Sequence, residues 1–305
     1  MTRLLAIGEC MIELSPGAAG DQWQLGFAGD TVNTVWYARA GLDPKTDCVG
    51  YFTALGRDSM SDRIMGFLNH AGIGTQSIRR IEGKNPGLYL IEQKDGDRAF
   101  MYWRGDSAAR RMADDAGALA AAMQNADMIY LRGITLAILD SAGRDRLCDA
   151  LQAARTAGKS IAYDPNIRPA LWQGADEMRS TLMRVAGLAN IVLPSFEDEA
   201  RVFGDATPAA TVARYRAAGA AEIVVKDGGA PVTLHDGSQI AVPQCAVVDA
   251  TAAGDSFNGG YLAARLKGAS PAQAARAGIE ISAQVIQARG AILHLPGLDL
   301  WAGPS

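Results

Sequence analysis

The chain has 305 residues, 49% of them hydrophobic and 20% charged, a composition typical of a globular enzyme with a large core. A net charge of −4 without any Lys/Arg cluster excludes an electrostatic nucleic-acid binder, and no apolar run is long enough for a signal peptide or a membrane span. No CxxC motif is present, so neither a zinc site nor a disulfide framework is indicated. We therefore expect a cytoplasmic protein without nucleic-acid or membrane partners. The four scattered cysteines are Cys10, Cys48, Cys148 and Cys245.

In chain order, the first β-rich segment is 11–29. A second, at 87–105, contains Asp95-Gly96, which is a strong hairpin signal. We expect the two segments to form a small β lid beside the main sheet. Further along, four helical patterns lie near 114–126, 138–157, 175–187 and 208–218. Each is followed by a short apolar strand, at 128–134, 160–166, 191–195 and 222–228.

This alternation predicts an α/β fold with a doubly wound, mainly parallel sheet and helices on both faces. The sequence contains no internal repeat and no linker-like tract, so we predict a single domain, 1–305, that carries the lid. Ligands of such sheets bind at the carboxyl ends of the strands. Three polar turns fall at such ends: DPN (164–166), VKDG (225–228) and TAAGD (251–255).

The stretch VVDATAAGDSFNGG (247–260) predicts an anion site. Val247 and Val248 are typical of the end of a strand, and a helix is expected from Ser256 to Lys267 with Asp255 at its first turn. The small residues 252–254 allow a ligand to approach the backbone amides at the positive end of the helix dipole. Asp255 either complements that dipole or acts as a base beside a bound phosphate.

Other phosphate-binding motifs are absent. The GKS at 158–160 is not a P-loop, because Ala153 stands where that motif needs glycine and because a strand follows it. No GxGxxG, HRD or DFG motif occurs. The histidines His70, His235 and His294 are isolated and are interpreted as structural or surface residues.

DATAAGDSFNGG (249–260) resembles the carboxyl-terminal signature of the PfkB (ribokinase-like) carbohydrate kinases, DTxGAGD followed by a helix. FAGDTVNTVWYARAG (27–41) resembles the first signature of that family, GGDxxN followed by a helix. The two motifs lie at the expected ends of the chain, so the resemblance covers essentially all of it. Ala250 and Ala252 replace the usual Thr and Gly.

Three further stretches resemble the 2-keto-3-deoxygluconate kinases of this family: GLYLIE (87–92), MYWRGDSAAR (101–110) and DPNIRPALW (164–172). The resemblance implies transfer of phosphate from ATP, with Mg²⁺, to the primary hydroxyl of 2-keto-3-deoxygluconate, giving the 6-phosphate. Two alternatives remain open. One is a neutral-sugar kinase of the fructokinase or ribokinase kind, and the other is a non-catalytic sugar-binding regulatory protein.

The resemblance also implies roles for individual residues. The amides of Ala252, Ala253 and Gly254 would form an anion hole for the transferring phosphoryl group, and Asp255 would be the base. An aspartate of ordinary pKa, about 3.9, is ionised at neutral pH. Gly29, Asp30 and Asn33 would meet the sugar hydroxyls, although Asp30 and Asn33 could instead cap the following helix.

A sugar acid needs a cation, because a guanidinium pairs with a carboxylate through planar hydrogen bonds. Arg104 and Arg168 are the candidates, with Arg110 as an alternative. Tyr89 and Tyr102 would cover the substrate, or else contribute to a lid core or to a homo-oligomer contact through the lid.

On the nucleotide side, Lys226 and Gly228 resemble the VKxG loop near ATP. The family's NxxE motif, which organises magnesium through water, falls at Ser195–Asp198, with Ser for Asn and Asp for Glu.

Overall fold

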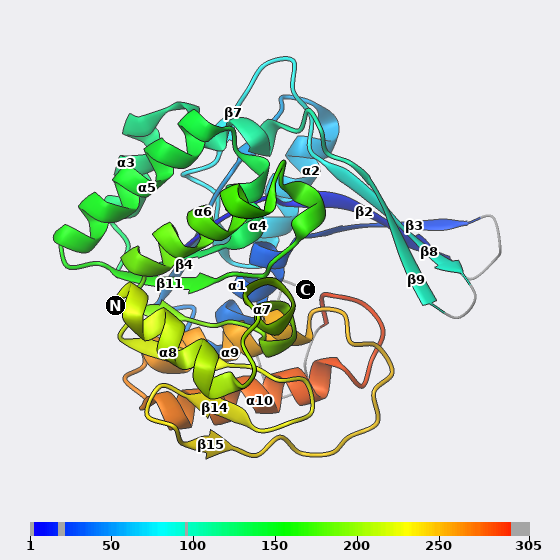
Figure 1. Cartoon of the computed structure of the whole chain (residues 1–305). Coiled ribbons are helices and arrows are strands. Elements are labelled where there is room, and N and C mark those ends of the chain that lie inside the picture. Colours follow the sequence, from blue (N-terminus) through cyan, green and yellow to red (C-terminus); the bar gives the residue numbers. More distant parts are fainter. Residues whose placement is uncertain (1–2, 18–21, 95–96, 294–305) are drawn as a thin grey trace.

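A nine-stranded sheet runs through the middle of the molecule (Figure 1). The computed structural model describes residues 3–17, 22–94 and 97–293. Seven neighbouring strands are parallel, and β14 and β15 add an antiparallel edge. In spatial order the strands are β15 (Gln239–Ile240), β14 (Val232–Leu234), β13 (Glu222–Val225), β12 (Ile191–Val192), β11 (Ser160–Asp164), β10 (Met128–Arg132), β1 (Arg3–Ile7), β4 (Cys48–Phe52) and β6 (Ile73–Gly74).

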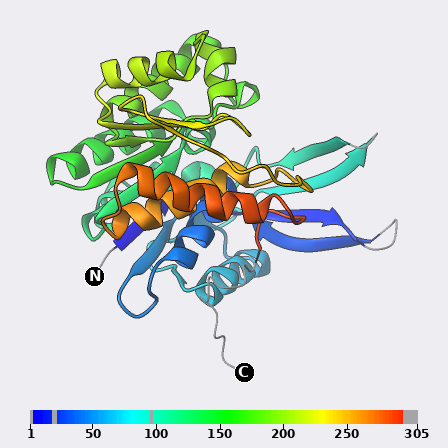
Figure 2. The same cartoon turned by 90° about the horizontal axis from the view of Figure 1, so that it is seen from below.

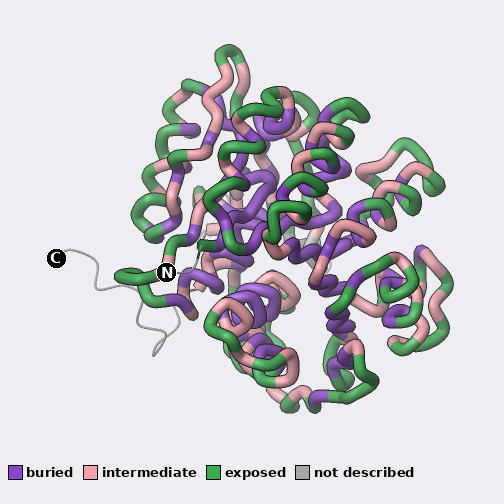
Figure 3. The backbone as a smooth tube through the Cα atoms, turned by 90° about the vertical axis from the view of Figure 1, so that its left-hand side faces the viewer, coloured by how far each residue is buried: buried purple, intermediate pink, exposed green. Residues whose placement is uncertain are grey.

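Helices cover both faces of this sheet, as predicted. Successive side chains of a strand point to opposite faces, and β1 shows the result: Leu4 and Ala6 join one buried cluster, Leu5 and Ile7 the other. The first cluster packs against α1 (Asp30–Gly41), α2 (Ser59–His70), α9 (Ala253–Leu266) and α10 (Pro271–Val285). The second packs against η1 (Ala108–Asp114), α3 (Ala116–Gln124), α4 (Gly133–Ile138), α5 (Ser141–Thr156), α6 (Ala175–Leu188), α7 (Phe196–Phe203) and α8 (Pro208–Ala218). Figure 3 shows the buried backbone between these layers and the exposed outer turns.

The lid is a separate four-stranded sheet that projects from one side of the body (Figure 2). Its order is β3 (Trp23–Ala28), β2 (Met11–Pro16), β8 (Leu88–Lys94) and β9 (Asp97–Trp103). β2 and β8 are parallel, so the two β-rich segments meet at the centre of the lid. β8 and β9 are antiparallel, while the predicted Asp95-Gly96 turn lies outside the described residues. A two-stranded sheet, β5 (Ala54–Leu55) and β7 (Arg79–Arg80), and a short η2 (Pro169–Leu171) complete the fold.

Several element boundaries differ from the prediction. The four strands end two or three residues early. The helix predicted over 138–157 is α5, and the short α4, which was not predicted, occupies 133–138 where the first of these strands was expected to end. Asp140 separates them, because its side chain accepts a hydrogen bond from the Gly143 amide and caps α5. The strand predicted to end at Val247 and Val248 is wrong. Both side chains are exposed in an irregular segment, whose Val248 amide donates to the Ile286 carbonyl rather than to a strand.

None of the described helices combines the length and the apolar composition needed to cross a lipid bilayer.

Candidate active site

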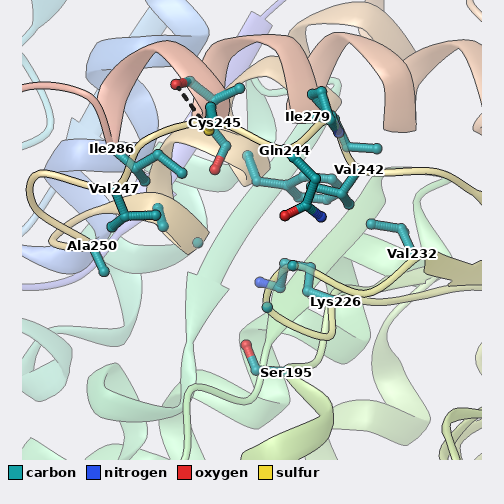
Figure 4. Close-up of a pocket in the computed structure, with 18 of the residues that line it drawn as sticks. Ser195, Lys226, Val232, Val242, Gln244, Cys245, Val247, Ala250, Ile279 and Ile286 are labelled. Atoms are coloured by element: carbon teal, nitrogen blue, oxygen red, sulfur yellow. Dashed lines mark hydrogen bonds between the residues drawn. The ribbon is translucent and has the colours of Figure 1, made fainter.

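Two cavities meet at the amino-terminus of α9. One, of about 530 Å³, has a polar lining and lies between the lid and the carboxyl ends of the strands. The other, of about 410 Å³, is mostly apolar and lies between the 226–232 and 242–250 segments and α10 (Figure 4). Both volumes are in the range of small-molecule sites. Four residues line both cavities: Ser195, Ala250, Ala253 and Gly254.

The turn between the cavities forms because Ala252 adopts a left-handed conformation, with φ of 61°. Glycine adopts this conformation freely, whereas alanine there costs on the order of 1 kcal/mol. The Ala253 amide donates to the Ala250 carbonyl at 3.2 Å. Within the described chain, no acceptor is found for the amides of Ala252 and Gly254. Two of the three amides predicted to form an anion hole are thus open at the positive end of the helix dipole.

The amino-terminal motif (27–41) lies against the carboxyl-terminal motif (249–260). Gly29 precedes α1 and packs on the chain at Glu9, where an added Cβ would come within 2.2 Å of the Glu9 carbonyl oxygen. Both polar atoms of the Asn33 side chain are hydrogen-bonded within the protein. Its Nδ2 donates to Oδ2 of Asp255 at 2.8 Å, and its Oδ1 accepts from the Gly29 amide. Asp30 accepts from Asn166 Nδ2 at 3.0 Å. The N-cap of α1 is Gly29, which makes no side-chain capping bond. Asp30 accepts from the Thr31 amide at 2.8 Å, so Asp30 and Asn33 both bind amides at the start of α1 as well as lining the cavity.

A buried arginine that sequence reasoning missed lies beneath this pair. Arg132, at the end of β10, is 4% exposed, and its Nη1 donates to Oδ1 of Asp255. Its Nη2 donates to Oδ2 of Asp164 at 2.8 Å. Asp164 also accepts from Lys226 Nζ at 2.9 Å and from Asn258 Nδ2 at 2.6 Å. A continuous series of bonded charged side chains therefore runs from Asp255 in the polar cavity, through Arg132 and Asp164, to Lys226 in the wall of the apolar cavity.

This environment changes the acidity of the two carboxyl groups in opposite directions. Burial raises the pKa of Asp255; Arg132 and Asn33 oppose that rise, and the nearby Asp30 carboxylate adds to it. The expectation of an ordinary aspartate is therefore wrong. Burial also acts to raise the pKa of Asp164, but Arg132 and Lys226 outweigh it and hold that pKa at about 2. Asp255 is thus the more basic of the two carboxylates.

Above the cavity, Tyr89 and Tyr102 face each other from β8 and β9 with ring centroids 5.9 Å apart. Arg104 follows β9, and its Nη2 donates to the buried Glu9. Ser107 donates to the other oxygen of that carboxylate. Glu9 therefore ties the base of the lid to the main sheet.

Arg168, which directly precedes η2, also lines the polar cavity. Its side chain is 50% exposed, and Nη1 donates to Oδ2 of Asp198 at 3.0 Å. Asp198 also pairs with Arg201 and lines neither cavity, whereas Ser195 lines both. The described residues contain no group of three or more His, Cys, Asp or Glu side chains able to hold a metal ion.

The structure brings together most of the predicted site. The polar cavity is lined by all eight residues predicted to meet the sugar: Gly29, Asp30, Asn33, Tyr89, Tyr102, Arg104, Arg168 and Asp255. Lys226, Gly228, Ala253 and Gly254 line the apolar cavity, while Ala252 lines only the polar one. Arg110 lines neither. One feature of the sequence could have pointed to Arg132: it is the single charged residue of an otherwise apolar strand. Glu9 likewise interrupts an apolar run.

Comparison with known proteins identifies the family to which this chain belongs. The family model of the pfkB carbohydrate kinases matches residues 1–297, and the chain belongs to that family. Several relatives carry the name 2-dehydro-3-deoxygluconokinase. The one from Dickeya dadantii is 40% identical over 302 residues, covering 96% of this chain and 97% of the relative. The one from Escherichia coli K12 is 38% identical over 301 residues, covering 95% and 97%.

Solved structures share the fold. A PfkB protein from Polaromonas sp. JS666 superposes with a TM-score of 0.80 at 27% identity, covering 94% of this chain and 96% of that one. A 2-dehydro-3-deoxygluconokinase from Thermotoga maritima gives 0.82 at 20% identity, covering 97% of each chain. An Escherichia coli protein described as a ribokinase II candidate, in complex with ATP and Mg²⁺, gives 0.83 at 22% identity, covering 96% and 95%. The predicted ribokinase-like fold and the predicted kinase family are both confirmed.

Proposed function

We propose that this carbohydrate kinase transfers the terminal phosphoryl group of ATP to the primary hydroxyl of 2-keto-3-deoxygluconate (2-dehydro-3-deoxygluconate), giving the 6-phosphate. The observation that carries the proposal is the junction of two cavities at one helix amino-terminus beside Asp255. A phosphoryl donor in one cavity and a hydroxyl acceptor in the other would meet there. The names of the two relatives at 38–40% identity support the sugar acid as acceptor.

The chain's own residues supply what phosphoryl transfer needs, which is mostly positioning and charge stabilisation. Asp255 would accept the proton of the attacking hydroxyl, because its raised pKa makes its carboxylate a stronger base than that of an ordinary aspartate. The open amides of Ala252 and Gly254 would receive the oxygens of the phosphoryl group as negative charge spreads over them.

The apolar cavity suits a nucleotide. Val232, Val242 and Ile279 are among its lining residues, and Lys226 and Ser195 lie across the cavity from Val242 and Ile279 (Figure 4). The described residues offer no ready-made metal cage. This fits Mg²⁺, which is usually bound through substrate phosphates and water with few protein ligands. Ser195 would contribute at that place, and the magnesium would neutralise phosphate charge.

The acid group of the substrate would be held by Arg168 and Arg104, which both line the polar cavity. Both arginines have a carboxylate partner, but Arg168 is the more accessible: its side chain is 50% exposed, whereas that of Arg104, paired with the buried Glu9, is 10% exposed. A neutral-sugar kinase is the competing hypothesis. Release of ADP, measured with 2-keto-3-deoxygluconate, its galacto epimer, fructose and ribose, tests both. A preference for either neutral sugar would contradict the proposed substrate, and no turnover with any sugar would contradict the kinase assignment.

We further propose that a second copy of the chain covers the lid. Four large side chains of β3 and β9 that lie outside the polar cavity are at least 38% exposed: Trp23, Leu25, Met101 and Trp103. The strand register places these side chains on one face of the lid sheet, and an exposed apolar group of this kind is typical of a protein interface.

A further inference from the structure

Arg132 is a buried cation whose position the fold alone does not explain. It ends β10, and its guanidinium lies among carboxylates from three other elements: Asp255 of α9, Asp164 of β11 and Asp30 of α1, whose Oδ2 is 3.6 Å from Nε. A buried ion network of this kind is often no more stable than a packed apolar core. Its presence therefore calls for another reason.

The other partners of each carboxylate indicate which one depends on Arg132. Asp164 has a second cation, Lys226, and an amide, Asn258. Asp30 accepts from Asn166 and from the Thr31 amide. Asp255, by contrast, is bonded to one amide, Asn33, and to one cation, Arg132, among the described residues.

The two partners of Asp255 also fix its orientation. Asn33 takes Oδ2 from the α1 side, and Arg132 takes Oδ1 from the sheet side. Each carboxylate oxygen has two lone-pair positions, so one on each oxygen stays available for the proton of a hydroxyl in the cavity. Both Arg132 and Asp255 line that cavity.

We propose that Arg132 is a positioning residue for the catalytic base: it keeps the Asp255 carboxylate ionised in a buried site and holds it toward the acceptor hydroxyl. This inference rests on the proposed kinase function. It assigns to Arg132 no contact with the sugar acid itself.

The other charged or titratable groups around Asp255 do not replace Arg132. Asp30, on α1, opposes ionisation of Asp255, and Asp164, on β11, is itself negative. Lys226, directly after β13, favours ionisation but bonds directly to Asp164 rather than to Asp255. The phenols Tyr37 and Tyr130 stay neutral, because burial raises the pKa of each.

The test is the pH profile of kcat/KM for the preferred sugar in the full chain, for wild type, Arg132→Met and Arg132→Lys. The acid limb of this profile is the low-pH side, where kcat/KM rises as the base loses its proton. Loss of a neighbouring opposite charge moves a carboxyl pKa up by about 1–3 units, so the acid limb of Arg132→Met should move to higher pH by that amount. Arg132→Lys keeps the charge but not the two-sided geometry. Its acid limb should stay within about half a unit of wild type, with a kcat plateau lowered about tenfold.

The control is Arg214→Lys. Arg214 is a partly buried arginine, 20% exposed, with two carboxylate partners, Glu199 and Asp205, outside both cavities. The Arg214→Lys variant should have a lower melting temperature than wild type, while the acid limb of its pH profile should stay at the wild-type position. If Arg132→Met does not fold by circular dichroism, Arg132→Gln serves as the neutral variant, since its amide still donates to a carboxylate.

Two results would overturn the proposal: an unmoved acid limb in the neutral variant, or an equal shift in the Lys and neutral variants. A wild type that phosphorylates no sugar would remove the kinase function instead. Arg132 is then tested by carbon-13 NMR of the carboxyl signal that Asp255→Asn removes. That signal should titrate at higher pH without Arg132, and an unchanged titration would refute the role.

Discussion

The side-chain amide of Asn33 donates a hydrogen bond to Oδ2 of Asp255 at 2.8 Å, across 222 positions of sequence. This bond joins the two signature motifs directly, because α1 and α9 pack side by side on the same face of the sheet. Asn33 was predicted to meet the sugar; in the structure its side chain lines the polar cavity and also binds Asp255, the proposed base.

Asn33→Ala removes one of the two partners of Asp255. A hydrogen bond to a charged group contributes about 1.5–3 kcal/mol, so kcat should fall about tenfold to a hundredfold. Steady-state kinetics with saturating ATP measure this. Asn69→Ala is the matched control, because Asn69 accepts from Thr75 at the end of α2, away from both cavities. Equal rates in the two variants would show that Asn33 does not position the base.

Asp255→Asn removes the base and keeps the shape of the side chain. We expect kcat to fall by about 10²–10⁴-fold. Because Asp255 lines the polar cavity and not the apolar one, ATP affinity should change little. Isothermal titration with a non-hydrolysable ATP analogue and a coupled kinase assay measure the two effects. A variant that retains near-wild-type turnover excludes Asp255 as the base.

Arg168→Ala should raise KM for the sugar acid about tenfold to a hundredfold and scarcely change KM for ATP, because an unpaired carboxylate costs about 1–3 kcal/mol. Arg104→Ala should do the same and also lower the melting temperature, since it strips the buried Glu9 of its cation. Arg110→Ala is the matched control, as Arg110 lines neither cavity. If all three variants give the same KM, the carboxylate is bound elsewhere.

Glu199 gives a pH dependence of stability that is independent of catalysis. Burial raises its pKa to about 7, despite its bonds to Arg214 and Tyr215. The folded state then holds its proton more tightly than the unfolded state does. The stabilisation is therefore complete below about pH 4.5 and is lost as pH rises through 7.

Glu199→Gln lacks this titration. The unfolding free energy of wild type relative to Glu199→Gln should decline by about 1–3 kcal/mol between pH 4.5 and 8. Urea unfolding of both proteins at several pH values measures the difference. A constant difference across this range would mean that Glu199 is ionised throughout.

The proposed lid contact is tested by the mass of the protein in solution. Light scattering coupled to gel filtration should give twice the chain mass for wild type. The double variant Trp103→Ser, Met101→Ser should give the mass of one chain, because it removes exposed apolar surface from β9. Gln152→Ser, on the exposed side of α5, should behave as wild type. A wild-type protein of single-chain mass would refute the contact.

Sequence patterns predicted the layers of this fold because strand and helix periodicities are local. The same patterns failed at Val247 and Val248, where β-branched residues favour a strand but no neighbouring strand offers a partner. The motif residues were predictable because each motif is continuous in sequence. Arg132 and Glu9 were not, since their roles come from contacts with Asp255 and Arg104, which are distant along the chain. The raised pKa of Asp255 likewise depends on burial, which its own motif does not encode.

The polar cavity is lined from Glu9, just after β1, to Ala291, beyond α10, whose carbonyl accepts a hydrogen bond from Tyr37 Oη at 2.8 Å. On the ribosome, residues near position 9 emerge long before those near 291. The growing chain therefore has no complete cavity until α9, α10 and the segment around Ala291 have been made. Substrate in the cell can stabilise only molecules that have passed that point, since a ligand stabilises only the state that binds it. Shorter chains, released early, would meet proteases and chaperones without that protection.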